Sequence, residues 1–258
     1  MFLINPYILQ SSVIDADAQA FITAASITDL TQQSAINQLV LDLKSYSIWS
    51  KLEAIYPYVG GNATSHSYNL KDTTKFQITW SGGVTHDLNG VTGNGTNGYG
   101  NTNLVPNTVL TNFISAGVYI GTNVQENKYD IGTLVSGSRG TWINSRDTSN
   151  RIDTITMDGT NKYYTGITDS SGFSCVNRTD STNRQIYKNG IVSNQTNAAA
   201  SYSIYPIYVL SLDTNNVAGS FSSRNQRFSF IGNSLTTTEH TNLYTAVQAF
   251  QTTLSRQV

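Results

Sequence analysis

The sequence predicts a mainly β protein, built as a β-sandwich with helices at both ends. Between about residues 59 and 230, short runs rich in β-branched and aromatic residues alternate with Gly, Asn, Ser and Thr. Turn signals at this regular spacing are typical of a sandwich or a jelly roll. Before and after this region, the apolar residues recur at helical spacing instead, which predicts flanking helices.

The composition argues against one class of partner, the nucleic acids. Only 12% of the residues are charged, the net charge is −1, and no run of Lys or Arg occurs. Nucleic-acid binding through phosphate neutralisation is therefore excluded. A surface built from uncharged hydroxyls and amides is typical of extracellular and virion β proteins.

Residues 1–14 form an apolar segment interrupted by Asn5-Pro6. Because proline disfavours helix at the preceding residue, this segment is expected to be an extended arm. It has no basic n-region and no long apolar core, so neither a signal peptide nor a membrane span is expected. The arm either packs on the domain or docks on a partner, in the second case through Phe2, Leu3, Ile4 and Ile8.

Residues 15–58 are expected to be a helical segment packed on the sandwich. Side chains that can cap its first two helices stand at Asp15 or Asp17 and at Thr28 or Asp29. The second helix is expected to run to about Tyr46. Ile48, Leu52 and Ile55 predict a third, shorter helix that ends before Pro57.

Residues 59–258 are expected to form the sandwich and its closing helix. The strongest local signal is Asn189-Gly190 between alternating runs, which predicts a hairpin with a type I′ turn. Thr236 with Glu239 predicts a capping box at the start of the closing helix. The segment 90–103 is so rich in Gly and Asn that it is expected to be a loop. Other strands are expected over 76–80, 113–120, 140–144, 151–157, 162–165, 205–212 and 227–231.

Several short segments also occur in a recognisable order along the chain. They lie at 15–25, 31–37, 58–61, 69–72, 81–86, 94–99, 221–225, 230–232 and 243–254. Together they resemble the concanavalin A-like (laminin G-like) lectin modules of bacteriophage tail fibres, spikes and other virion structural proteins. The resemblance implies an antiparallel jelly-roll sandwich on the virion surface, bound to other virion proteins, and a homo-oligomer, in the family's style a trimer.

The sequence offers little support for catalysis. Glycoside hydrolysis needs two carboxylates roughly 5 to 9.5 Å apart across a sugar-binding cleft. Enzymatic relatives of this fold carry them on one strand as Glu-x-Asp-x-x-Glu, and no such run exists here. Glu126 and Asp130 come nearest, but their spacing does not place both on one strand face. The three histidines are scattered and show no zinc spacing. We therefore expect no enzyme.

No cofactor is expected. A bound calcium ion is kept as an alternative, because many lectins of this fold bind calcium. Calcium needs clustered oxygen ligands. The aspartates in or near loops form no recognised ligand loop; they are Asp147, Asp153, Asp158, Asp169 and Asp180. Cys175 is the only cysteine, so no intrachain disulfide can form, and a buried thiol is expected.

A sugar-binding site needs exposed aromatic rings that stack on the sugar, surrounded by amides and hydroxyls that bind the sugar hydroxyl groups. The aromatic candidates are Tyr99, Trp142, Tyr163 and Tyr164, and the polar candidates are Asn97, Arg139, Asn144 and Asn161. Trp142 alternates with Ile143, so it either meets a ligand or packs in the core. The two adjacent tyrosines must face opposite sides of one strand.

These observations predict a virion structural protein, as a spike, fibre tip or capsid appendage, that recognises glycan on the host surface. Weak sites would gain strength from oligomerisation. The alternative is a purely architectural virion protein without glycan binding, and a third possibility is a glycan depolymerase.

Overall fold

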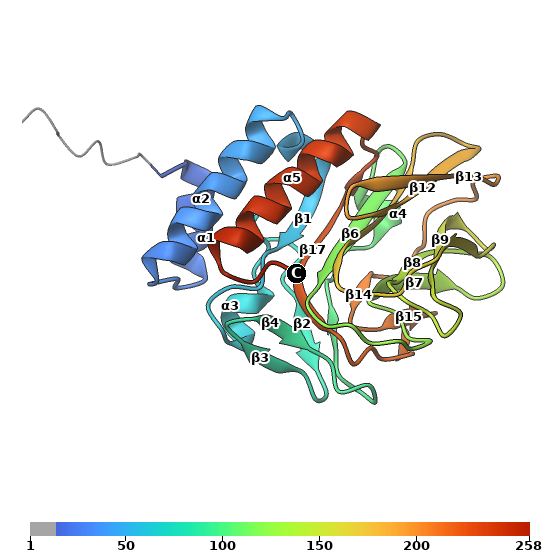
Figure 1. Ribbon diagram of the computed structural model, residues 1–258, viewed down its shortest axis with the longest axis horizontal. Helices are drawn as coiled ribbons and strands as arrows, with labels where there is room; N and C mark the ends of the chain where they lie inside the picture. The colour runs from blue at the N-terminus through green and yellow to red at the C-terminus, as the bar shows by residue number, and fades with distance from the viewer. Residues whose placement is uncertain (1–13) are drawn as a thin grey trace, which may run out of the picture.

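The computed structural model describes residues 14–258 and shows a mainly β protein in three layers (Figure 1). Helices α1 (Ala16–Ala24), α2 (Leu30–Ser45) and α5 (Thr237–Thr253) form the first layer. Two sheets, called sheet A and sheet B, form the other two. The β-sandwich with helices near both ends of the chain is thus confirmed. The predicted docking residues Phe2, Leu3, Ile4 and Ile8 lie outside the described residues.

The helix starts follow the predicted caps. Asp15 accepts a hydrogen bond from the amide of Asp17 at the start of α1, and Asp29 accepts one from Gln32 at the start of α2. At α5, Thr236 and Glu239 form the full capping box. Each side-chain cap satisfies a helix amide that has no partner within the helix. Three shorter helices are η1 (Trp49–Lys51), α3 (Ala63–Ser67) and α4 (Pro106–Val109).

Sheet A lies between the helices and sheet B. Its strand order is β13-β12-β11-β6-β17-β4-β3, and β1 pairs with β17 beside this path. All of its pairings are antiparallel. The strands are β1 (Leu52–Tyr56), β3 (Thr85–Asp87), β4 (Gly90–Thr92), β6 (Ile114–Ile120), β11 (Gly172–Arg178), β12 (Asn183–Lys188), β13 (Ile191–Thr196) and β17 (Asn225–Asn233).

Sheet B forms the third layer, with the order β10-β9-β8-β7-β14-β5-β2. The hairpin of β15 and β16 joins it through a short parallel pairing of β15 with β7. The strands are β2 (Thr79–Ser81), β5 (Tyr99–Asn101), β7 (Ile131–Val135), β8 (Arg139–Asn144), β9 (Arg151–Asp158), β10 (Lys162–Thr165), β14 (Tyr208–Val209), β15 (Leu212–Thr214) and β16 (Val217–Gly219).

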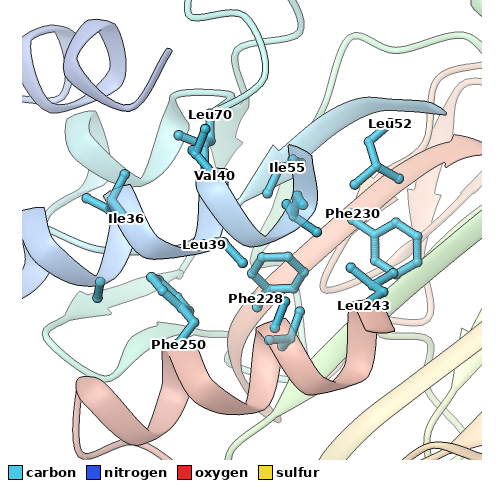
Figure 2. Close-up of a cluster of buried hydrophobic side chains, with 14 of the residues drawn as sticks. Ile36, Leu39, Val40, Leu52, Ile55, Leu70, Phe228, Phe230, Leu243 and Phe250 are labelled. Atoms are coloured by element: carbon cyan, nitrogen blue, oxygen red, sulfur yellow. The ribbon is translucent and has the colours of Figure 1, made fainter. Parts of the chain in front are cut away.

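Two apolar cores hold the three layers together. The first lies between the helices and sheet A, where Phe228 and Phe230 of β17 meet Leu39 of α2 and Phe250 of α5 (Figure 2). The second fills the space between the sheets and includes Val118 of β6 and Ile143 of β8. Each fully buried large apolar side chain stabilises the fold by roughly 1.5–3 kcal/mol relative to exposure. Cys175 is buried in the first core, as predicted.

The predicted third helix is wrong. Only Trp49–Lys51 is helical, as a single turn, and Leu52–Tyr56 form strand β1. This strand pairs with β17, and its side chains alternate between the two cores: Leu52 and Ile55 enter the first, Ala54 and Tyr56 the second. Tertiary pairing overrides the helical spacing here, because a β strand buried on both faces has no polar side to reveal its period.

Two expectations about the following region also need correction. The strand expected over 76–80 starts only at Thr79, since Phe76 has a positive φ of 56° and bends the chain. The segment 90–103 is not only loop, because β4 and β5 lie within it. Its glycines still fit a turn-rich segment, with φ of 119° at Gly90 and 73° at Gly95.

Within residues 14–258, no helix is long and apolar enough to span a bilayer.

Candidate functional site

The outer face of sheet B is the candidate site. Sheet A is covered on both faces, by the helices and by sheet B. On sheet B, side chains such as Ile143, Ile152 and Val209 point into the core between the sheets. Successive residues of a strand point to opposite faces. Their neighbours Trp142 and Asp153 therefore point outward.

Six aromatic residues lie along a stripe on this side, which we call the aromatic face. It consists of Tyr99, Tyr129, Trp142, Tyr163, Tyr208 and Phe221. The ring centroids of Tyr129 and Trp142 lie 5.0 Å apart, and those of Tyr99 and Tyr208 also lie 5.0 Å apart in a stacked pair. Phe221 connects the two pairs, because its ring lies 6.1 Å from Tyr99 and its backbone forms a β-bridge with Tyr129. Such offset and tilted contacts are the favoured ring arrangements.

The stripe has a buried floor and exposed edges. Trp142 and Tyr208 are only 7% and 5% exposed. Tyr99, Tyr129 and Phe221 are half-buried and pack against this floor. The floor fixes the positions of the half-buried rings, so the face presents rigid apolar surface to solvent at little cost in side-chain entropy.

Tyr163 extends the stripe onto the edge strand β10. The Arg151 guanidinium lies 3.8 Å from the centre of the Tyr163 ring. Asp147 holds this arginine in place, with Oδ2 2.7 Å from one terminal nitrogen and 2.8 Å from Nε. The ion pair with Asp147 raises the pKa of Arg151. The arginine therefore supports the ring and stays charged.

One carboxylate, that of Asp153, borders the stripe. Asp153 lies beside Tyr163 in the pairing of β9 with β10, and it accepts a hydrogen bond from Asn161 Nδ2 at 2.8 Å. Burial raises the pKa of the Asp153 carboxyl, and the nearby Asp147 charge adds to the rise, while Asn161 and Arg151 oppose it. The indole of Trp142 also favours the charged form, although its Nε1–H forms no hydrogen bond within the described chain.

Asp213 of β15 is a buried acid, and its neighbour Leu212 packs with Trp142, so Asp213 points to the opposite side of the strand. Neither of its carboxylate oxygens has a hydrogen-bond partner of normal geometry among residues 14–258. Burial raises the pKa of Asp213 to about 6, partly offset by the backbone amides of Asn216 and Val217. Its charge in turn adds to the effect of burial in raising the pKa of Tyr208 to about 12.

Half of the predicted site residues meet on this face. Tyr99, Trp142 and Tyr163 belong to the stripe, and Asn161 orients Asp153. Tyr164 faces the other way and packs against the core between the sheets, in line with the expected opposition of the two tyrosines.

The remaining three polar candidates have local partners. Asn97 lies in the loop before β5, where its side-chain oxygen accepts hydrogen bonds from Gly83 N and Asn94 Nδ2. Asn144 is buried and donates to the carbonyl of Glu126. Arg139 donates from Nε to the carbonyl of Tyr202. These contacts brace loops and strand ends; whether they also reach a ligand stays a prediction.

Four residues of this region were not predicted from the sequence: Tyr129, Asp153 as a ligand-facing acid, Tyr208 and Phe221. A signal existed for Tyr208, because it lies between Ile207 and Val209, whose side chains enter the core. Strict alternation therefore puts the tyrosine outside. Tyr129 and Phe221 precede strands on loops more than 90 residues apart, so only the folded chain brings them together.

Three of the five loop aspartates considered for calcium have protein partners. Asp158 is buried between Arg178 and Arg184, with distances of 2.6 and 2.8 Å. Asp147 pairs with Arg151, and Asp180 accepts hydrogen bonds from Thr182 and Asn183. Over residues 14–258, no group of three or more His, Cys, Asp or Glu side chains is arranged to hold a metal ion.

Two hollows near the helical layer are poor alternatives. Their volumes are about 170 and 250 Å³, below the roughly 300–1,000 Å³ of typical small-molecule pockets. The first is lined by Arg256, which donates all of its recorded hydrogen bonds to backbone carbonyls and to Gln251. This arginine connects the segment after α5 to the sandwich, and it has few N–H groups left to donate to a ligand.

Comparison with protein-family models gives no match, and neither does comparison with curated proteins. Solved structures do share the fold. Domain 4 of AbnA, an extracellular GH43 arabinanase from Geobacillus stearothermophilus solved with arabinotriose, is 13% identical with a TM-score of 0.52, and the match covers 75% of this chain and 98% of that domain.

Two further neighbours are longer than this chain. The Trypanosoma rangeli sialidase in complex with 2,3-difluorosialic acid is 10% identical with a TM-score of 0.55, over 82% of this chain and 38% of the sialidase. A mutant of HCR/D is 14% identical with a TM-score of 0.53, over 77% of this chain and 53% of that one. At these identities the likeness establishes a shared β-sandwich fold and nothing of the chemistry.

Proposed function

We propose that this chain is a glycan-binding module and that the aromatic face holds the sugar. The observation that carries the proposal is the stripe of six rings on the outer face of sheet B, four of them half-buried. Aromatic faces suit the apolar faces of sugar rings, while Asp153 and Asn161 offer polar groups for sugar hydroxyls. The arabinotriose bound by the AbnA domain is in keeping with this use of the fold.

We place the module on the surface of a virion, as a spike, fibre tip or capsid appendage that contacts host glycan. The support is the resemblance to concanavalin A-like modules of phage structural proteins and the low charge of the chain, 12%. Oligomerisation, in the family's style as a trimer, would multiply weak sites into firm attachment. Sedimentation of the pure protein tests the oligomer, and labelled antibodies on intact particles test the location.

The proposed role is binding without cleavage and without a metal. Hydrolysis needs a pair of carboxylates spaced across the sugar. The aromatic face offers the Asp153 carboxylate of β9, whereas Asp213 of β15 is fully buried. We expect no release of reducing ends from host polysaccharide, and no loss of binding in EDTA.

The test is titration of the protein with arabinotriose, followed by a glycan array with the protein displayed multivalently. Replacing Tyr99 or Tyr163 by Ala should weaken sugar binding by roughly 0.5–1.5 kcal/mol, the size of an aromatic stacking contact, or about two- to tenfold in Kd. Neither ring belongs to the buried core between the sheets, so the fold should survive.

Trp49→Ala is the matched control, because Trp49 is also a half-buried aromatic but lies in the helical layer beside Lys44 and Lys71. Its sugar affinity should equal that of the wild type. Absence of any bound glycan on the multivalent array would refute the proposal and favour a purely architectural protein.

A further inference from the structure

An acid without an ionic partner lies beside the aromatic face. Asp153 borders the stripe and forms no salt bridge with a residue in 14–258. Resting on the proposed function, we propose that the aromatic face selects uncharged glycans and discriminates against glycans that carry a carboxylate. Sialic and uronic acids are the acidic sugars it would reject.

The three arginines of this region already have partners. Arg151 is held by Asp147 through two contacts of 2.7 and 2.8 Å, and its guanidinium covers the Tyr163 ring. Arg146 donates to Asn123 and Asn150, and Arg139 donates to Tyr202 O and Ser138 Oγ. A ligand carboxylate would have to displace one of these partners to pair with any of the three arginines.

Asp153 is the group that a bound sugar would meet. It lies on the strand next to Trp142 and is opposite Tyr163 on β10. Its Oδ1 accepts one hydrogen bond, from Asn161, so the carboxylate retains free acceptor capacity. It is half-buried among the rings, where water screens charge less than at an open surface.

The free acceptor capacity of Asp153 favours a ligand that donates hydrogen bonds to its carboxylate. A sugar hydroxyl can donate to the Asp153 carboxylate in a charge-assisted hydrogen bond. A ligand carboxylate has no proton to donate at neutral pH and meets a like charge in a poorly screened setting. Repulsion between like charges across an interface is a common source of specificity.

A glycan array that presents each backbone with and without its sialic or uronic acid tests the proposal. The wild-type protein should bind uncharged glycans and bind their acidic counterparts about tenfold or more weakly. Equal binding of acidic and uncharged counterparts would overturn this inference while leaving the proposed function intact. An array without any bound glycan would refute both.

The variant Asp153→Asn identifies the group responsible. Asn removes the charge but keeps the size and a hydrogen-bonding oxygen, so the ratio of acidic to uncharged binding should rise about tenfold. Asp169→Asn is the control, because Asp169 is exposed on the loop after β10 and accepts only the amide of Ser171; its ratio should equal that of the wild type. An unchanged ratio in Asp153→Asn, with a native circular dichroism spectrum, would count against the inference.

Discussion

Histidines that stand apart in the sequence are buried in the folded chain. His66 Nδ1 lies 3.1 Å from His86 Nδ1, and burial, together with that neighbour, lowers the pKa of His66 to about 3. His240 stacks on Tyr187 at 4.2 Å, and burial lowers its pKa to about 3 as well. At neutral pH these rings are uncharged. They are best understood as core groups whose protonation opposes folding.

Low pH should therefore reduce the stability of the fold, because these rings take up protons in the unfolded chain and stay neutral in the folded one. An unfolded histidine titrates near 6.5, so the contribution of His240 to stability is complete above that pH and declines as the pH falls toward 3. Between pH 7 and 5 the loss is about 2 kcal/mol for one such histidine. Asp213, with its raised pKa, acts in the opposite direction. Comparison with a variant that lacks His240 separates the contribution of this histidine from that of Asp213.

The variant is His240→Phe, which keeps an aromatic ring against Tyr187. Urea denaturation at pH 7 and pH 5 should show that the wild type loses about 2 kcal/mol more than this variant over the interval. Equal losses would show that His240 is not held neutral in the folded protein.

At the scale of elements, the hairpin of β12 and β13 shows how local chemistry sets a turn. Asn189 and Gly190 have φ of 48° and 79°, both positive, as a type I′ turn requires. The Asn189 side chain also accepts a hydrogen bond from the amide of Phe173, which ties the turn to β11. A Cβ added to Gly190 would lie 2.9 Å from the Tyr244 ring of α5. The turn thus joins the sheet to the helical layer.

Gly190→Ala should cost more than a glycine replacement at an open turn. A left-handed conformation costs an L-residue roughly 1–2 kcal/mol, and overpacking against Tyr244 adds roughly 1–3 kcal/mol. Gly137→Ala is the control, because Gly137 has a φ of 69° but no atom within 4 Å of an added Cβ. Chemical denaturation should rank Gly190→Ala below Gly137→Ala, and equal stabilities would contradict the close approach.

At the scale of the whole molecule, buried ion clusters join the two sheets. Arg178 and Arg184 of sheet A bind Asp158 of sheet B, and Arg224 beside sheet A binds Asp130 beside sheet B at 3.0 Å. All three arginines are fully buried. Taking charges out of water is costly, so such clusters contribute more to the register of the sheets than to net stability.

Asp158→Asn should destabilise the protein by roughly 3–5 kcal/mol, because it leaves two buried arginines without their anion. The exposed replacement Asp169→Asn should change the free energy of unfolding by less than about 0.5 kcal/mol. Urea denaturation of both variants measures the difference. A similar small effect for both would mean that the buried arginines find other partners.

Features that depend on contacts within a few residues were predicted correctly from the sequence, and a feature that depends on a distant strand was not. The caps at Asp15, Asp29 and Thr236 and the turn at Asn189-Gly190 are confirmed, because each is decided by contacts within a few residues. The helix expected around Leu52 is wrong, because β1 is decided by its pairing with β17, more than 170 residues away.

By itself, the sequence determined the mainly β class, the flanking helices and the main turns, and it predicted four residues of the candidate site, namely Tyr99, Trp142, Asn161 and Tyr163. These follow from residue periodicity and turn chemistry, which act over short stretches of chain. Only the tertiary structure decided which face of sheet B stays uncovered, and it brought Tyr129, Tyr208 and Phe221 into the stripe. The physical reason is that strand order and layer packing are non-local, and no short segment records which distant strand will cover it.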